Sequence, residues 1–230
     1  DANIESAVNG SIAGIFGASG QSCVAGSRLY LHNSIADEFL DKMRQQAQTI
    51  KLGDPLEDAT QMGPLATYAQ IEHIERQVEM AKAEGGTILT GGDRGDTPAT
   101  GWYYPPTIIE CPRQDLTIVG TELFGPVLSV LRFDHEEEVL QLANDSQFGL
   151  AAGVFTRDGA RALRMTKALR AGIVWVNTYR VVSPIAEFGG FKESGYGRES
   201  GMQAIYDYTR PKTAWLNISD APMTNPFVMR

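Results

Sequence analysis

The sequence predicts an α/β fold, namely an open, mostly parallel sheet with helices on both faces. Strand-like segments alternate along the chain with segments whose apolar residues recur every three to four positions, which is the pattern of strand–helix–strand units. The strand-like segments are short apolar runs, as expected for strands that are covered on both faces. The chain has 230 residues, 43% hydrophobic and 21% charged, which suits one large globular domain, or one domain with an appendage.

The alternation begins with a helix. Ile4, Val8, Ile12 and Ile15 lie three to four positions apart, and Asp1 is the expected N-cap. Glycines at positions 14, 17 and 20 then break the helical pattern. The elements that follow are a strand at 27–32, helices along 35–50 and 68–84, and strands at 87–90, 103–109 and 128–133.

The second half of the chain continues this order. Asp134 and Asp158 are the expected N-caps of two further helices. A last strand follows a proline and stands apart from the alternation, with a polar tail after it. These elements span 136–144 and 159–170 for the helices, 150–156 and 173–177 for the strands that accompany them, and 212–218 for the last strand.

Charge and composition exclude several classes of partner. The formal net charge of −8 argues against nucleic acid and against an anionic membrane surface. The sequence has no run of 18 apolar residues and no basic start of a signal peptide, so neither a membrane span nor secretion is expected. Two cysteines are too few for a disulfide framework and favour a reducing, cytoplasmic location. The histidines, His32, His73 and His135, lack zinc-ligand spacing, so no metal site is expected.

Cys23 is the candidate nucleophile. It lies in a glycine-rich stretch, residues 17–26, and such a turn exposes backbone N–H groups and lets a ligand approach closely. Those N–H groups can stabilise both a thiolate and an oxyanion. A small buried cysteine in a tight turn is the other interpretation. Cys111 precedes a proline at a predicted strand end and is interpreted as structural.

Three further segments carry residues suited to ligand binding. Within 120–127, the carboxylate of Glu122 can accept hydrogen bonds from a ribose diol, and the ring of Phe124 can pack on a flat heterocycle; a surface glutamate and a core phenylalanine are the alternative. Asn177 ends a predicted strand, and ligands collect at the carboxyl ends of parallel strands. The stretch 188–199 holds four glycines and predicts a constrained turn that is neither a Walker-A loop nor a dinucleotide fingerprint.

Taken together, four segments resemble the NAD(P)-dependent aldehyde dehydrogenase superfamily. They occur in the same order and at similar separations, and the resemblance extends from residue 1 to about residue 218. It implies the fold of an aldehyde dehydrogenase catalytic domain, and the oxidation of a small-molecule aldehyde to a carboxylic acid with NAD or NADP. The four segments are Gly-Gln-Ser-Cys ending at Cys23, Glu-Leu-Phe-Gly-Pro-Val from Glu122, Val-Asn-Thr around Asn177, and Phe-Gly-Gly-Phe-Lys-Glu-Ser-Gly-Tyr-Gly-Arg-Glu from Phe188.

The resemblance also implies roles for single residues. Cys23 would attack the aldehyde carbonyl, its backbone N–H would help to hold the oxyanion, and a thiohemiacetal and then a thioester would form on its sulfur. Glu122 would bind the nicotinamide ribose, and Phe124 would pack beside the nicotinamide. Phe188 would line the substrate tunnel, and Asn177 would support the nucleophile.

By the same resemblance, the chain corresponds to the C-terminal half of such an enzyme. A catalytic domain is expected at 1–193, a connecting segment at 194–208, and an oligomerisation strand with its tail at 209–230. Homo-oligomers would form through Lys212–Ile218. The coenzyme-binding domain, the general-base glutamate and most of the NAD(P) site would precede residue 1, so these 230 residues alone are expected to lack the redox step.

Two other functions stay open on the sequence. An inactive stand-alone fragment could act as an assembly or binding module, because an unpaired strand edge invites pairing with another chain. A thiol esterase could use Cys23 on activated esters without NAD.

Overall fold

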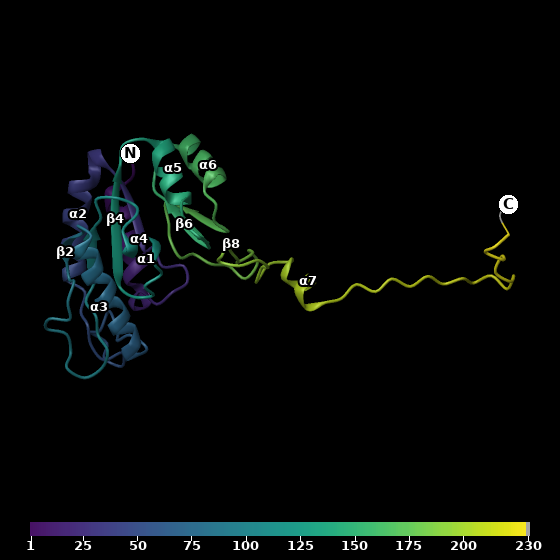
Figure 1. The fold of residues 1–230 in the computed structure, drawn as a ribbon, viewed down its shortest axis with the longest axis horizontal. Coiled ribbons are helices and arrows are strands. Elements are labelled where there is room, and N and C mark those ends of the chain that lie inside the picture. The colour runs from purple at the N-terminus through teal and green to yellow at the C-terminus, as the bar shows by residue number, and fades with distance from the viewer. Residues whose placement is uncertain (229–230) are drawn as a thin grey trace.

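A computed structural model describes residues 1–228 and contains a four-stranded sheet at the centre of its larger part (Figure 1). The strand order is β1-β4-β3-β2. β4 is parallel to both of its neighbours, and β2 is antiparallel to β3. The mostly parallel sheet expected from the sequence is therefore confirmed, with one antiparallel edge. The strands are β1 (Arg28–His32), β2 (Thr87–Thr90), β3 (Thr107–Glu110) and β4 (Val127–Phe133).

Helices cover both faces of this sheet. On one face, α1 (Ile4–Phe16) and α2 (Asn33–Gln48) share a core with Leu128 and Val130 of β4. On the other face, α3 and α4 share a core with the alternate β4 residues Val127 and Leu131. This alternation explains the continuous apolar run of β4, because successive side chains point to opposite faces and both faces are buried. The second pair of helices are α3 (Tyr68–Ala83) and α4 (Thr117–Gly120).

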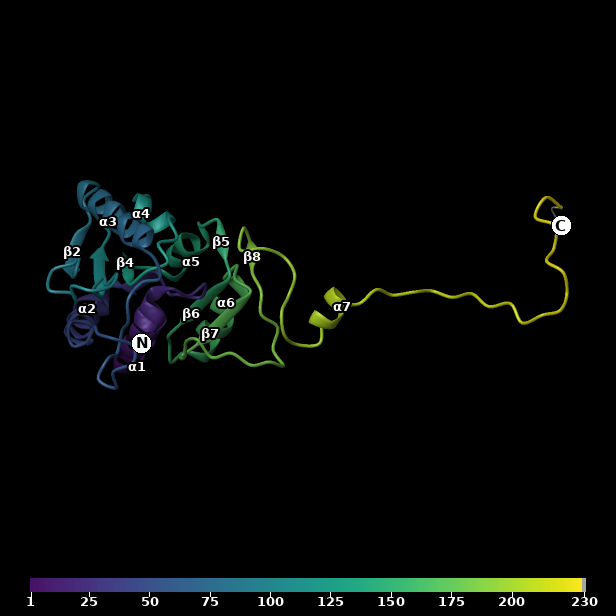
Figure 2. The same cartoon turned by 90° about the horizontal axis from the view of Figure 1, so that it is seen from below.

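A second, smaller α/β layer follows in the sequence. It contains α5, α6 and the parallel strand pair β6 and β7, and its small core is formed by Val139, Met165 and Leu169. β5 (Phe148–Gly149) pairs with β8 (Phe191–Lys192) in an antiparallel pair. Figure 2 shows β6 and β7 beside α1, on the opposite side from β2. The bounds are α5 (Glu136–Asn144), β6 (Ala151–Val154), α6 (Gly159–Ala168) and β7 (Ile173–Val176).

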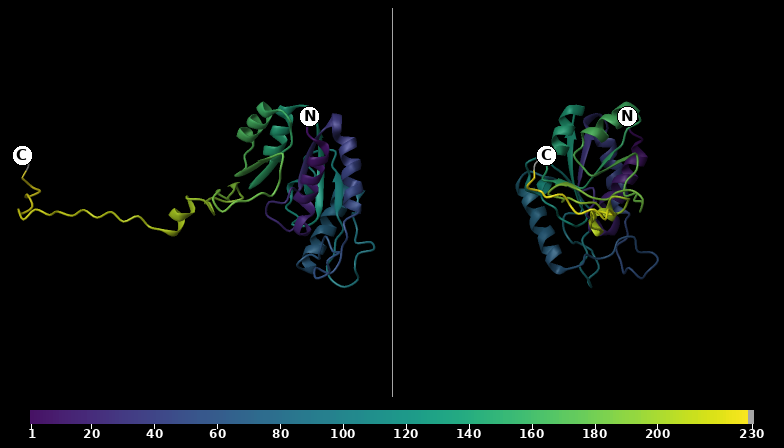
Figure 3. Two further views of the ribbon diagram at one scale, coloured as in Figure 1. Left: turned by 180° about the vertical axis from the view of Figure 1, so that it is seen from behind. Right: turned by 90° about the vertical axis from the view of Figure 1, so that its right-hand side faces the viewer.

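The chain ends in a short helix and an extended tail. From α7 (Ala204–Tyr208) onward, the backbone lies away from the body of the protein, as Figures 1 and 3 show. Residues 212–218, where the sequence predicts an oligomerisation strand, form no strand within this single chain. A strand needs a neighbour for its backbone hydrogen bonds, and within residues 1–228 none lies alongside this segment. Trp215 is consequently 94% exposed.

Two of the three predicted helix caps are wrong. Asn3, not Asp1, caps α1, since its Oδ1 accepts a hydrogen bond from the Ser6 N–H at 2.9 Å. The Asp1 carboxylate instead accepts a hydrogen bond from the Thr156 hydroxyl at 2.9 Å and pairs with Arg161 at 3.0 Å. The side chain of Asp1 therefore joins the start of the chain to the second layer.

The cap of α5 also differs from the prediction. Its N-cap is His135, and the Glu138 carboxylate accepts a hydrogen bond from the backbone N–H of Asp134 at 3.0 Å. The Asp134 carboxylate accepts a hydrogen bond from Asn33 at the start of α2. The prediction for α6 is confirmed, because Asp158 accepts hydrogen bonds from two backbone N–H groups of the first turn.

The described residues contain neither a candidate membrane-spanning helix nor a candidate metal-binding cluster. No helix within residues 1–228 has both the length and the apolar character that crossing a bilayer requires. The same residues hold no group of three or more His, Cys, Asp or Glu side chains that could bind a metal ion.

Candidate active site

Cys23 lies in an exposed turn between α1 and β1. The chain reverses direction at Gly17–Gly20, where Ala18 and Ser19 have φ values of 54° and 55°. Hydrogen bonds then fix the turn, since the Gly26 N–H donates to the carbonyl of Gly14 in α1 at 3.2 Å. The thiol of Cys23 is thus presented to solvent on a backbone that is tied to the preceding helix.

Two side chains anchor this turn to the loop that precedes α3. The Ser19 hydroxyl donates a hydrogen bond to the carbonyl of Gly63 at 2.9 Å, and Ser19 is buried. The Gln21 side-chain carbonyl accepts a hydrogen bond from the Ala66 N–H at 2.9 Å. Gln21 belongs to the Gly-Gln-Ser-Cys segment, but nothing in the neighbouring sequence indicates its contact with Ala66.

The turn also lies directly against the segment that carries Glu122. Gly20, with φ of 71°, packs so closely on Gly125 and Pro126 that an added Cβ would overlap with the Gly125 carbonyl. Only glycine fits a position that combines a positive φ with this approach. The structure therefore brings together the first two segments that the sequence singled out.

Glu122 and Phe124 are both exposed after the end of α4. Between them, Leu123 is buried and holds the segment to the core. The Gln70 side chain on α3 donates hydrogen bonds to the carbonyls of Leu123 and Phe124. Phe124 has φ of 52° and is 41% exposed, so this backbone turn presents a carboxylate and an aromatic ring to solvent.

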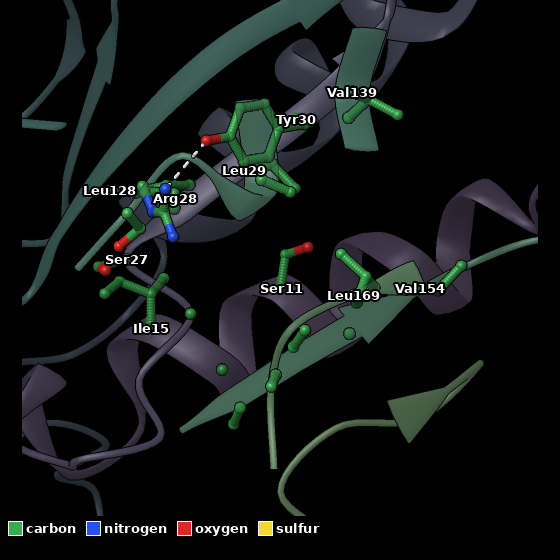
Figure 4. Close-up of a pocket in the computed structure, with 18 of the residues that line it drawn as sticks. Ser11, Ile15, Ser27, Arg28, Leu29, Tyr30, Leu128, Val139, Val154 and Leu169 are labelled. Atoms are coloured by element: carbon green, nitrogen blue, oxygen red, sulfur yellow. Dashed lines mark hydrogen bonds between the residues drawn. The ribbon is translucent and has the colours of Figure 1, made fainter. Parts of the chain in front are cut away.

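Cys23, Glu122 and Phe124 all line one large cavity. It has a volume of about 850 Å³, and Cys23, Glu122, Phe124 and Tyr179 are among its lining residues. It extends between the four-stranded sheet and the second layer, and Figure 4 shows its apolar part, where Ile15 and Leu128 face Val154 and Leu169. The dashed line in Figure 4 is the hydrogen bond from Arg28 to the Tyr30 hydroxyl, at 3.2 Å.

Asn177 lies outside the lining of this cavity. Its side-chain amide forms two hydrogen bonds with the backbone of Thr156, accepting from the N–H and donating to the carbonyl, both at 2.9 Å. Asn177 has φ of 54°, a conformation that asparagine tolerates better than most residues. Its contacts join the ends of β6 and β7 and turn the chain toward Tyr179.

Phe188 is also absent from the cavity lining. It is half-buried, and its backbone forms two hydrogen bonds with Glu199, both at 2.7 Å. The loop that follows is held to the end of α5, because the Lys192 ammonium donates to the carbonyls of Asn144 and Ser146 at 2.7 and 2.9 Å. Phe188 and Asn177 are therefore not assembled with Cys23 around this cavity.

Cys111 differs from Cys23 in being buried. It is 3% exposed, and burial raises the pKa of its thiol to about 11. A protonated, inaccessible thiol is a poor nucleophile. These properties agree with the structural interpretation of Cys111.

Tyr179 also lines the cavity, and the sequence places it near the substrate entrance without naming a ligand for it. It follows the Asn177 turn, and its ring lies 4.7 Å from that of Trp175, centroid to centroid. Burial raises the pKa of Tyr179 to about 12. Its sequence signal, an aromatic residue just after a strand end, was too general to indicate a ligand.

Comparison with known proteins gives the family. The family model described as "Aldehyde dehydrogenase family" matches residues 1–214. A (Z)-2-((N-methylformamido)methylene)-5-hydroxybutyrolactone dehydrogenase from Acinetobacter baylyi is 52% identical over 100% of this chain and 47% of its own length. A betaine aldehyde dehydrogenase from Brucella anthropi is 42% identical over 96% of this chain and 46% of its own length.

Solved structures agree with this assignment. The structure of PnpE in complex with nicotinamide adenine dinucleotide matches with a TM-score of 0.94 and 44% identity, over 99% of this chain and 47% of its own. The NAD⁺ complex of an aldehyde dehydrogenase from Bacillus cereus matches with a TM-score of 0.92 and 42% identity, over 95% and 44%. The chain spans about half the length of the relatives it matches. From the family match and these similarities, we conclude that the chain belongs to the aldehyde dehydrogenase family.

Proposed function

We propose that this chain is the catalytic, C-terminal half of an NAD(P)-dependent aldehyde dehydrogenase, with Cys23 as its nucleophile. The observation that supports this most is that Cys23, Glu122 and Phe124 line one cavity although about a hundred residues separate the first from the other two. An exposed thiol, a carboxylate and an aromatic ring at one cavity are the groups that an aldehyde and a nicotinamide nucleotide require.

The reaction follows from the chemistry of the thiol. The Cys23 thiolate adds to the aldehyde carbon, and a backbone N–H in its turn stabilises the oxyanion that develops. The carbonyl re-forms as hydride leaves that carbon, which gives a thioester on the cysteine sulfur. Water then attacks the thioester, releasing the carboxylic acid and regenerating the thiol. A thiolate suits both steps because it is a strong nucleophile and a good leaving group.

The coenzyme would supply one thing, the acceptor of that hydride. Two residues of this chain fit it by their chemistry. The exposed Glu122 carboxylate can accept hydrogen bonds from a ribose diol, and the exposed Phe124 ring offers a flat apolar surface to a nicotinamide. Gln70 donates hydrogen bonds to the carbonyls of Leu123 and Phe124 and so holds the backbone beside both side chains.

The remaining assignments concern the rest of the enzyme. We place the catalytic domain at 1–193, the connecting segment at 194–208, and an oligomerisation segment at 209–230. Trp215, Leu216 and Ile218 are each more than 85% exposed, and apolar side chains of this size are normally covered by a partner. We therefore propose that Lys212–Ile218 pairs with a second copy. Because the chain spans about half the length of its relatives, we also propose that the coenzyme-binding domain, the general base and most of the NAD(P) site lie before residue 1.

Replacement of the nucleophile tests the proposal. In the full-length protein that contains this chain, Cys23→Ala is expected to lower aldehyde-dependent NADH formation by at least about a thousandfold, as for removal of a covalent nucleophile. Cys111→Ala is the matched control and is expected to keep the activity of its folded fraction. NADH formation by Cys23→Ala at the wild-type rate would overturn the proposal.

A further inference from the structure

Tyr179 contacts three segments of the fold, namely α1, β6 and the Cys23 turn. Each element presents a glycine to the ring: Gly14 from α1, Gly153 from β6, and Gly26 from the end of the turn itself. Because glycine has no side chain, the ring can approach all three backbones at once. This arrangement links the cysteine to a residue that enters none of the chemical steps above.

The two edges of the ring contact different elements. A Cβ on Gly14 would lie 3.1 and 3.2 Å from Cδ1 and Cε1, on one edge. A Cβ on Gly153 would lie 2.7 Å from both Cδ2 and Cε2, on the other edge. The ring is thus held between α1 and β6, with no space for a methyl group on the β6 side.

The tip of the ring contacts the nucleophile turn. A Cβ on Gly26 would lie 3.3 Å from the Tyr179 hydroxyl oxygen and 3.5 Å from Cζ. Gly26 also donates its N–H to the carbonyl of Gly14, so the same two glycines are joined by a hydrogen bond beside the ring. A shift of the ring toward or away from Gly26 would therefore move the backbone three residues after Cys23.

The backbone on both sides of Tyr179 is fixed. Asn177 binds both backbone groups of Thr156, and the Arg180 guanidinium donates to the carbonyl of Ala13 in α1 at 3.2 Å. The hydroxyl of Tyr179 stays protonated and neutral at working pH, because burial raises its pKa to about 12. The ring cannot easily withdraw from the turn, so it acts as a rigid spacer.

From these contacts we propose that Tyr179 is a positioning residue, whose ring sets the place of the Cys23 turn relative to α1 and β6. The inference rests on the proposed role of Cys23. Its chemical basis is that displacement of a reacting group by about 1 Å can lower a rate by about a hundredfold. The ring carries these contacts: its two sides lie against α1 and β6, and without the hydroxyl its Cζ and Cε1 still lie 3.5 and 3.8 Å from the place of a Cβ on Gly26.

The test compares Tyr179→Leu with Tyr179→Phe in the full-length protein. Tyr179→Leu is expected to lower kcat by about ten- to a hundredfold and to change the rate of Cys23 alkylation by iodoacetamide more than threefold. Tyr179→Phe keeps the ring and is expected to stay within threefold of wild type in both measurements. If the Cys23 alkylation rate of Tyr179→Leu stays within threefold of wild type, the proposal is wrong.

Tyr103→Leu is the matched control for a loss of stability alone. Tyr103 is 5% exposed, packs against Gly101, and donates its hydroxyl to the carbonyl of Gly53 at 2.9 Å, away from the cavity lining. We expect it to lower the thermal midpoint and to leave Cys23 alkylation within threefold of wild type. An equal effect of Tyr103→Leu on alkylation would also overturn the proposal.

A second variant and a readout that is independent of turnover separate the role of Tyr179 from that of Cys23. If Tyr179→Leu does not fold, Gly153→Ala takes its place, because the added methyl group presses on the ring from β6 without contacting the turn. The rate of Cys23 alkylation in Gly153→Ala is expected to change more than threefold. An unchanged rate would count against the role of Tyr179. Alkylation needs neither aldehyde nor coenzyme. An active Cys23→Ala enzyme would thus refute the proposed function, whereas an unchanged alkylation rate in the Tyr179→Leu and Gly153→Ala variants would refute only the role of Tyr179.

Discussion

Gly20 and Gly125 are in backbone contact, and neither could gain a side chain without displacing its surroundings. A Cβ on Gly20 would overlap with the Gly125 carbonyl, and one on Gly125 would overlap with Ile74 of α3. The contact joins the turn of the proposed nucleophile to the segment proposed to bind the coenzyme. The distance between thiol and nicotinamide would therefore depend on two residues that carry no functional group.

Substitution of Gly20 is expected to damage both stability and activity. Gly20→Ala combines a positive φ of 71° with a backbone clash, and overpacking of this kind typically costs about 1–3 kcal/mol. Gly195→Ala is the matched control, because Gly195 has φ of 102° with open space around it. Chemical denaturation should show a loss for Gly20→Ala that exceeds the loss for Gly195→Ala by at least about 1 kcal/mol. Equal losses would mean that the contact with Gly125 is unimportant.

Asn177 is expected to contribute to stability through its pair of hydrogen bonds with Thr156. Asn177→Ala leaves two backbone groups without their partners, and losing such contacts costs about 1–3 kcal/mol. Thr178→Ala, at the exposed neighbouring position, is the control and should change the free energy of unfolding by less than about 0.5 kcal/mol. Urea denaturation of both variants measures the difference, and a small effect of Asn177→Ala would contradict the structural role.

The two thiols are expected to react in sequence. Iodoacetamide should modify the exposed Cys23 in the native protein, while Cys111 stays unmodified because it is buried and its pKa is raised to about 11. Mass spectrometry of the digested protein identifies which cysteine carries the label. Addition of denaturant should then allow modification of Cys111. Native labelling of Cys111 at the rate of Cys23 would contradict the packing described above.

The ion pairs of Glu136 predict a dependence of stability on acid pH. The Arg164 guanidinium, and then that of Arg161, lower the pKa of Glu136 from its ordinary value of 4.5 to about 2. A carboxyl group whose pKa is lowered on folding stabilises the folded state above its ordinary pKa, and this contribution is lost as the pH falls from about 4.5 to about 2. Glu136→Gln should therefore be less stable than wild type at pH 7, with the difference shrinking through that range.

Glu72→Gln provides the control for this pH dependence. Glu72 is exposed on α3, so the same change of charge is made without loss of the Arg161 and Arg164 contacts. Thermal midpoints between pH 7 and pH 2 should differ little between Glu72→Gln and wild type. A constant difference between Glu136→Gln and wild type across the whole range would contradict the prediction.

The α/β architecture could be predicted because it depends on local patterns. The spacing of Ile71, Ile74, Val78 and Ala81 indicated a helix at 68–84, and the structure has α3 at Tyr68–Ala83 with these four residues buried. The strand expected at 103–109 begins only at Thr107, because two prolines precede it and cannot donate to the sheet.

Contacts across the fold could not be predicted in this way. Asp1 and Asp134 have the residue type of helix caps, but distant partners, Arg161 and Asn33, take their carboxylates. Cys23 and Glu122 line the same cavity because of the order of the strands in the sheet. No local sequence pattern indicates that order. Likewise, a segment such as 212–218 can have strand-forming residues and still form no strand without a neighbour.

The assembly of the cavity from distant parts of the chain has a consequence for folding kinetics. The turn of Cys23 lies near the start of the chain. Tyr179, which packs against Gly26 in that turn, follows β7, the last strand of the second layer. Contacts of such large sequence separation form slowly, because the entropy of closing the intervening chain is lost before the contact is gained. The cysteine is thus translated well before Tyr179, so the contact between its turn and that ring forms only after the second layer has been made.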